Sequence, residues 1–145
     1  MGDIAKDINS SFANSKVKAL LNLMYTANWI RNKQNSFFNA YGISPQQYNI
    51  LRILRGASKA ISVQTIRDRM IERAPNATRL MDKMCLKKLI DRVASKEDRR
   101  VVHIAITKEG LQLLSKIDKE LTSDWLQNLT EKEAIFLSDL LDKIR

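Results

Sequence analysis

The chain has 145 residues, of which 44% are hydrophobic, and its 25 Lys and Arg against 16 Asp and Glu give a net charge of +9 at pH 7. This length argues against a two-domain enzyme, and the hydrophobic share excludes wholesale disorder. We therefore expect one compact domain over residues 1–145 with a real apolar core.

Cysteine usage and hydropathy indicate the compartment. The single cysteine, Cys85, has no second thiol in the chain with which to form a disulfide, which favours a reducing environment. The N-terminus has an acid where a signal peptide needs basic residues, and no apolar segment follows. The longest apolar run, residues 134–137, is far short of the roughly 20 residues that a membrane helix needs. We expect a soluble, cytoplasmic protein without a membrane partner.

The positive charge is concentrated in the middle third of the chain. Residues 52–100 carry 14 Lys and Arg against 6 Asp and Glu, a net charge of +8, whereas residues 1–51 carry +3 and residues 101–145 carry −2. Segregated positive charge is typical of a polyanion partner, because each neutralised phosphate releases condensed counterions. A solvated basic face that only aids solubility explains the charge equally well, so local structure has to decide.

The first half of the chain predicts several helices. Apolar residues recur at steps of three and four over residues 4–30, with a weak link around Ser15, which predicts one or two amphipathic helices. The stretch Ser44–Gln47 combines a capping Ser, a Pro for the first helical position and a Gln that can close a capping box. This helix is expected to end at Gly56, and Ser62 begins another short one.

In the second half of the chain the apolar residues change from the helical period to a period of two. Pro75 predicts the first turn of a helix that runs to about Lys88 or Leu89. At 100° per residue, one arc of this helix is apolar and consists of Ala77, Leu80, Met81 and Met84. The adjoining arc is polar and basic and consists of Asn76, Arg79, Lys83 and Lys87. Alternating residues then predict an antiparallel hairpin of 90–94 with 101–106 around the charged turn 95–100. Thr107 and Thr130 cap two final helices.

The order of these elements predicts a mainly α fold with a small α+β wing, a winged helix-turn-helix. Two short helices are joined by a tight connection, the second exposes a basic strip, and a charged two-stranded ribbon follows. In this architecture the second helix enters the major groove of duplex DNA, where Arg can read guanine and Asn can read adenine. The wing then brings Arg or Lys to the minor groove.

Specific spacings add a family resemblance. Asp98, Arg100, Ile104, Ile106, Thr107 and Gly110 follow the pattern D-x-R-x-x-x-I/L-x-L/I-T-x-x-G. Residues 78–84 followed by 89–92 look like a recognition-helix pattern, and residues 129–133 look like the opening of a last helix. On these residues the chain resembles the MarR family of bacterial transcription regulators, over about residues 17–145. Lys88 departs from the pattern, because the family usually has Gly there.

The resemblance implies an obligate homodimer. Residues 43–107 then form the winged helix-turn-helix lobe, while residues 1–42 and 108–145 supply the helices that interleave at the dimer interface. It also implies a regulator that binds double-stranded DNA sequence-specifically at an inverted repeat, usually as a repressor. The alternative for the apolar stripes of both arms is packing within one monomer.

The resemblance also assigns site residues by position. Those of the recognition helix are Asn76, Thr78, Arg79 and Lys83, and those of the wing are Lys96, Asp98, Arg99 and Arg100. Asp98 is expected to hold an arginine through a charge-assisted hydrogen bond, a simple turn salt bridge being the alternative. For Lys87 and Lys88, the solvated end of a helix is the favoured interpretation.

The resemblance leaves open whether a small-molecule effector releases the protein from DNA. Some family members bind small aromatic or phenolic anions between the winged lobe and the dimer helices. Candidate wall residues, which equally fit an apolar core, are Tyr25, Trp29, Phe37, Phe38 and Tyr41. Members that sense peroxide use a cysteine in the first helix, and residues 1–42 contain none. Cys85 is expected to be a small buried hydrophobe.

An enzyme is not expected. The one histidine, His103, lies on an alternating strand, and the sequence has no Cys/His cluster with metal spacing, no G-x-S-x-G and no phosphate-cradling Gly loop. We therefore expect no catalytic residue, no metal and no cofactor. The alternative function is a non-specific architectural or RNA-binding basic protein, which would show little dependence on sequence, whereas a regulator requires a palindromic site.

Overall fold

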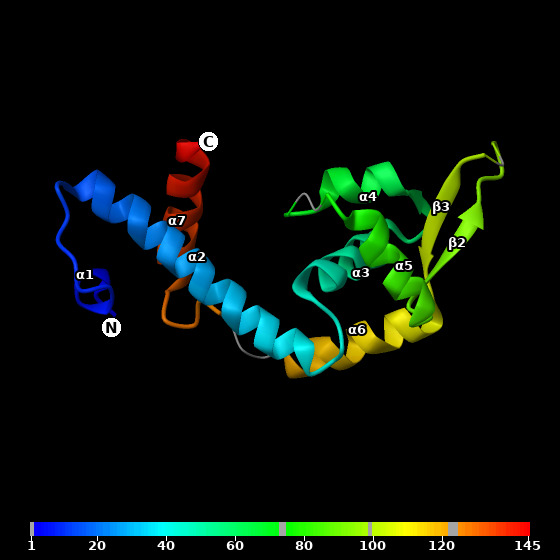
Figure 1. Ribbon diagram of the computed structural model, residues 1–145, viewed down its shortest axis with the longest axis horizontal. Helices are drawn as coiled ribbons and strands as arrows, with labels where there is room; N and C mark the ends of the chain where they lie inside the picture. The colour runs from blue at the N-terminus through cyan, green and yellow to red at the C-terminus, as the bar shows by residue number, and fades with distance from the viewer. Residues whose placement is uncertain (1, 73–74, 99, 122–124) are drawn as a thin grey trace.

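The computed structural model describes residues 2–72, 75–98, 100–121 and 125–145. Within these ranges the chain forms seven helices and a small sheet (Figure 1). The elements in chain order are α1 (Ile4–Asp7), α2 (Ser15–Asn39), α3 (Pro45–Ala57), β1 (Ile61–Ser62), α4 (Val63–Arg69), α5 (Ala77–Leu86), β2 (Ile90–Ala94), β3 (Val102–Ile106), α6 (Lys108–Glu120) and α7 (Glu131–Ile144). The mainly α fold with a small wing is therefore confirmed.

The molecule is elongated, and its two ends are built from different elements. Figure 1 shows α1, α2 and α7 at one end, and α3 to α6 with the sheet at the other. The long helix α2 begins at Ser15, the weak link of the sequence pattern, because the Asn14 side chain accepts a hydrogen bond from the Val17 N–H (3.0 Å). It then continues past residue 30 to Asn39 and so reaches the lobe at the other end.

Helix α3 begins as its sequence predicts. The Ser44 hydroxyl accepts a hydrogen bond from the Gln47 N–H (3.2 Å), and the Gln47 side chain accepts one from the Ser44 N–H (3.0 Å), which completes the capping box. Its predicted end at Gly56 is wrong. The helix runs to Ala57 and ends where Ser58 adopts the left-handed conformation (φ 55°), so Gly56 is an interior residue.

The hydrophobic core lies in the lobe at the wing end. It is built from α3 to α6 and the sheet, and its fully buried large side chains are Ile50, Leu51, Leu54, Ile66, Met81, Met84, Ile90, Ile104, Leu114 and Ile117. Helix α2 contributes one buried residue, Phe38, at its C-terminal end, and α7 contributes none. The apolar stripes of α2 and α7 are thus left largely uncovered by the single chain.

The sheet has the predicted hairpin and one additional strand. β2 and β3 pair antiparallel, with Ile90 opposite Ile106 and Ala94 opposite Val102. The two-residue strand β1 adds to the other edge of β3, with Ile61 opposite Ile104, so that the strand order is β1-β3-β2. Sequence reasoning missed β1 because two residues are too few to show an alternating pattern.

Helix α5 is shorter than predicted. It ends at Leu86, and the next turn is closed by two hydrogen bonds, from the Leu89 N–H to the Met84 carbonyl (3.0 Å) and from the Lys88 N–H to the Cys85 carbonyl (2.9 Å). Lys88 takes the left-handed conformation (φ 57°) that this closure requires and that favours glycine. The Thr107 hydroxyl donates to the Lys88 carbonyl (2.7 Å), which ties the start of α6 to the end of α5.

Candidate nucleic-acid interface

Helices α4 and α5 form the helix-turn-helix. The Ser62 hydroxyl accepts from the Thr65 N–H (3.1 Å) and so caps α4, whose Ile66 is buried in the core. The inner face of α5 is anchored by Ala77, Met81 and Met84, all buried, with Leu80 half-buried beside them. Because these residues recur every three or four positions, the adjoining face of α5 is directed to solvent.

The four residues predicted on the recognition helix, Asn76, Thr78, Arg79 and Lys83, are all exposed. Asn76 is the N-cap residue of α5, but its side chain makes no capping hydrogen bond. Arg79 and Lys83 form no ion pair with any residue in the described ranges. The helix therefore presents two cations without an acidic partner in those ranges, together with one amide that caps nothing, on a single surface.

Sequence reasoning missed a contact behind this surface. Arg67 of α4 reaches across the turn, and its Nη2 donates a hydrogen bond to the Thr78 Oγ1 (2.8 Å). The Arg67 Nε is buried without a hydrogen-bond partner in the part of the chain that the structure describes. No local pattern could have revealed this pair, because the two residues are on different helices and meet only when α4 and α5 pack.

The wing carries its predicted residues at the tip of the hairpin. Lys96, Asp98 and Arg100 are exposed, and Arg99 lies outside the described residues. Asp98 is expected to hold one of the two wing arginines, and it does not bond the Arg100 guanidinium, whereas a contact with Arg99 lies outside the described residues. The Asp98 carboxylate instead accepts the backbone N–H of Arg100 (2.9 Å), because a short Asp side chain readily closes a turn onto the main chain two residues later.

The rest of the wing turn is organised by a buried serine. The Ser95 hydroxyl accepts hydrogen bonds from the N–H groups of Glu97 (3.2 Å) and Asp98 (3.4 Å). Hydrogen bonds from main-chain N–H groups to the Ser95 and Asp98 side chains therefore hold the described part of the turn. The Arg100 guanidinium forms no ion pair with a described residue. The described cationic side chains at the tip of the wing, Lys96 and Arg100, are exposed to solvent.

The recognition helix and the wing are fixed to each other. Arg92 of β2 forms an ion pair with Asp82 of α5. This contact neutralises the acid on α5 and links that helix to the strand that leads into the wing.

Cys85 is half-buried on the same helix, and burial raises the pKa of its thiol, which keeps the thiol protonated near neutral pH. The structure thus places Cys85 at the edge of the core rather than fully inside it.

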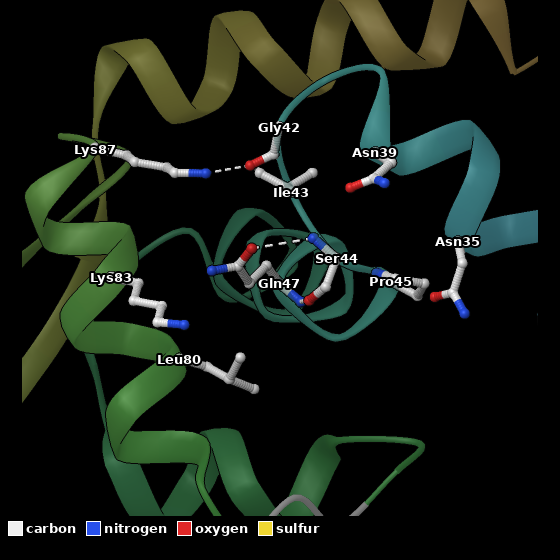
Figure 2. Close-up of a pocket in the computed structure, with 10 residues that line it drawn as sticks. All are labelled: Asn35, Asn39, Gly42, Ile43, Ser44, Pro45, Gln47, Leu80, Lys83 and Lys87. Carbon is white, nitrogen blue, oxygen red and sulfur yellow. Dashed lines mark hydrogen bonds between the residues drawn. The ribbon is translucent and has the colours of Figure 1, made fainter.

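A cavity of about 400 Å³ lies beside α5 (Figure 2). It is bordered by the end of α2, by the start of α3 and by α5, and its lining residues are Asn35, Asn39, Gly42, Ile43, Ser44, Pro45, Gln47, Leu80, Lys83 and Lys87. The Lys87 ammonium donates to the Gly42 carbonyl across its edge. Two cations and several amides therefore face a space between the long helix and the recognition helix.

The aromatic residues considered as cavity walls lie elsewhere. Phe38 is buried and stacks on Tyr48, with 4.3 Å between the ring centroids. Phe37 meets Tyr41 and Trp125 in edge-on or tilted contacts. These rings pack the joint between α2 and the lobe, so the core interpretation holds for them. Tyr25 and Trp29 remain partly exposed on α2.

A metal-binding cluster or a membrane-spanning helix would point to a different function. Over the described ranges, no group of three or more His, Cys, Asp or Glu side chains is placed to hold a metal ion. None of the helices in those ranges combines the length and apolar character that crossing a membrane requires.

Comparisons with known proteins agree with this geometry. A sequence model of the MarR family matches residues 41–101. The chain is 30% identical over 120 residues to the uncharacterized HTH-type transcriptional regulator YpoP of Bacillus subtilis, and the match covers 79% of this chain and 82% of that protein.

Solved structures extend the likeness to almost the whole chain. A MarR transcription factor from Planctomyces limnophilus is 31% identical with a TM-score of 0.69, covering 91% of this chain and 98% of that one. A cysteine-to-serine mutant of MarR from E. coli, solved in complex with operator DNA, shares the fold with a TM-score of 0.74 at 21% identity and covers 99% of both chains. This chain therefore belongs to the MarR family and is a winged helix-turn-helix transcriptional regulator.

Proposed function

We propose that this regulator binds double-stranded DNA as a homodimer and represses transcription from an inverted-repeat site. The observation that carries the proposal is a set of exposed cations on two adjacent elements, none of which forms an ion pair with a described residue. They are Arg79 and Lys83 on α5 and Lys96 and Arg100 on the wing. The E. coli MarR complex with operator DNA, which has the same fold, supports this role for the surface.

The two elements read different parts of the duplex. Helix α5 enters the major groove, where Arg79 donates two hydrogen bonds to a guanine edge and Asn76 pairs with an adenine edge. Lys83 and Thr78 add contacts beside them. The wing lies over the neighbouring minor groove, whose negative potential attracts Arg100 and Lys96. Arg99 belongs to the same proposed set. Phosphate contacts set the position of the protein, and base contacts supply the specificity.

A second copy of the chain covers the exposed apolar face of the arms. Leu20 and Met24 of α2 are 57% and 56% exposed, and Phe136 of α7 is 63% exposed. Monomeric proteins rarely leave contiguous apolar surface of this kind in water. Helix α7 and most of α2 are at the end of the molecule away from the wing (Figure 1), and these two helices therefore form the dimer interface. A monomer in light scattering at micromolar concentration would remove this part of the proposal.

A small aromatic anion is the effector class that the cavity beside α5 fits. Lys83 and Lys87 offer positive charge, and Leu80 and Ile43 offer apolar contact. An anion bound there engages Lys83 and so competes with its DNA contact. Benzoate, used as the probe, should weaken DNA binding by the wild-type protein but not by Lys87→Ala. Equal weakening of both proteins would place the anion elsewhere.

The main test is a gel shift with the DNA upstream of this protein's own gene, at a stated salt concentration. Arg79→Ala should lose roughly 1–3 kcal/mol of binding free energy and should lose discrimination at one base pair per half-site, because a bidentate base contact is removed. Arg100→Ala should flatten the slope of log affinity against log salt by about 0.9 for each phosphate that this arginine neutralises.

A matched control separates these effects from net charge. Lys119→Ala removes one positive charge from the C-terminal end of α6, outside the proposed surface, and should leave both affinity and salt slope close to those of the wild type. Binding to random DNA that is as strong as binding to the inverted repeat would favour the non-specific architectural alternative and would refute sequence-specific regulation.

A further inference from the structure

The contact between Arg67 and Thr78 is a feature of the helix-turn-helix that the proposed surface residues do not explain. Arg67 belongs to α4, and Thr78 is the second residue of α5. The Arg67 Nη2 donates to the Thr78 Oγ1 at 2.8 Å. Arg67 is half-buried, while Thr78 is exposed on the surface that is proposed to meet DNA. One half of this pair thus lies under the interface and the other half on it.

The guanidinium has no acid to neutralise it among the described residues. The two acids nearest to it in the sequence are engaged elsewhere. Asp68 accepts from the Gln64 amide (2.8 Å), and Glu72 accepts from the Gln46 amide (2.9 Å). The Nε of Arg67 is buried without a partner in the described ranges, and its Nη2 is committed to the Thr78 hydroxyl. Among the described residues, the Arg67 guanidinium therefore hydrogen-bonds only to the Thr78 hydroxyl.

This contact determines how the Thr78 hydroxyl can bond. A hydroxyl carries one donor hydrogen and two acceptor lone pairs, and its hydrogen rotates to suit its surroundings. A positively charged donor on the oxygen repels that hydrogen, which therefore points away from Arg67. Thr78 is in the first turn of α5, and its hydroxyl donates to no acceptor among the described residues. Within the part of the chain that the structure describes, the hydrogen is therefore left for an acceptor on a ligand.

We propose that Arg67 is a positioning residue for DNA recognition, which makes Thr78 meet DNA as a hydrogen-bond donor. This inference rests on the proposed function. Thr78 then selects an acceptor atom, which is either a phosphate oxygen or an acceptor on a base edge, such as guanine O6 or N7, adenine N7 or thymine O4. It disfavours the amino groups of adenine and cytosine, because these need an acceptor.

A double-mutant cycle tests the inference, with a duplex that the wild-type protein has selected from a random pool as the probe. Thr78→Val removes the hydroxyl at nearly constant shape, and Arg67→Met removes the guanidinium but keeps an apolar stem. Each single variant should bind the duplex roughly tenfold more weakly, as expected for the removal of one hydrogen bond. The double variant should bind no more than about twofold more weakly than Thr78→Val alone, because Arg67 acts through Thr78.

The control is Arg69→Met, which removes the same charge from an exposed position on the same helix. It should lose less than about threefold in affinity. Arg67→Lys, which keeps a cationic donor, should recover part of the affinity. Arg67→Ala, which also removes the guanidinium, replaces Arg67→Met in the cycle if thermal unfolding shows that the Met variant is not folded. Additive losses in the cycle, or an equal loss in Arg69→Met, would overturn the inference.

Two further measurements distinguish the source of the acceptor. If the acceptor is on a base, a new selection with Arg67→Met should admit an amino-bearing base at one position per half-site. If it is a phosphate, the selected sequence should stay the same, and one methylphosphonate substitution should abolish the effect of Thr78→Val. A wild-type protein that selects no duplex refutes the proposed function itself, whereas selection with an additive cycle refutes only the role of Arg67.

Discussion

Gly110 tests the junction where the recognition helix, the wing and α6 meet. A Cβ atom at this position would lie 2.3 Å from the Leu89 carbonyl oxygen and 2.8 Å from the Ile106 Cγ1. Both distances are well inside van der Waals contact. The Leu89 oxygen is main chain and accepts a hydrogen bond from the Thr107 N–H (3.1 Å), so it cannot rotate away as a side chain can. Gly110→Ala must therefore displace backbone at the end of α5 or at the start of α6.

The size of the effect follows from three contributions. Overpacking by one carbon in a packed site costs about 1–3 kcal/mol, and weakening the bond between Thr107 and Leu89 costs about 1 kcal/mol more. Alanine is favoured over glycine inside a helix by about 1 kcal/mol, which offsets part of this. We expect Gly110→Ala to lower the free energy of unfolding by about 2 kcal/mol, which corresponds to roughly 6 °C in Tm for a chain of this size.

Gly56→Ala is the matched control. Gly56 is inside α3, and no atom lies within 4 Å of a Cβ built there, so only the helix propensity acts. This variant should gain about 1 kcal/mol. Urea unfolding of both variants and the wild type, at one protein concentration, measures the difference. If Gly110→Ala is as stable as the wild type, or if both substitutions shift stability in the same direction, the reasoning from the close approach to Leu89 is wrong.

Two other positions give predictions of defined sign. Lys88→Gly should raise the free energy of unfolding by about 1 kcal/mol in the same urea assay, because Lys88 is left-handed (φ 57°) and glycine escapes the steric cost; an unchanged midpoint would contradict this. The Tyr41 hydroxyl donates a hydrogen bond to the Glu120 carboxylate, and this bond is the main reason why the pKa of Tyr41 is raised from 10.0 to about 12. Because the folded state favours the neutral phenol, this contact stabilises the protein fully below pH 10 and is lost as the pH rises through about 12. Tyrosinate absorbance during a pH titration should show one tyrosine with a raised pKa, and Glu120→Gln should return that pKa toward 10.0. A tyrosine that keeps the raised pKa in this variant would exclude Glu120 as the cause.

Local signals predicted those parts of the molecule that depend on neighbouring residues. The capping boxes at Ser44 and Thr130 mark the true starts of α3 and α7, because the bonds that define them join residues three positions apart. The hairpin was predictable because its side chains follow a period of two. Gly56 gave a false helix end, since a glycine permits a helix to end without requiring it.

Periodicity, composition and short spacings were enough to establish the fold class, the location of the +8 segment and the residues on the outer face of α5. Three contacts could be found only in the folded molecule: Arg67 holds Thr78, Asp98 bonds the main chain of Arg100 and not its guanidinium, and β1 joins the wing sheet. Arg67 and β1 meet partners whose separation is set by the packing of α4, α5 and β3 around one core, and no interval along the chain encodes that packing. For Asp98, the conformation of the turn brings the Arg100 N–H within hydrogen-bond distance of the carboxylate.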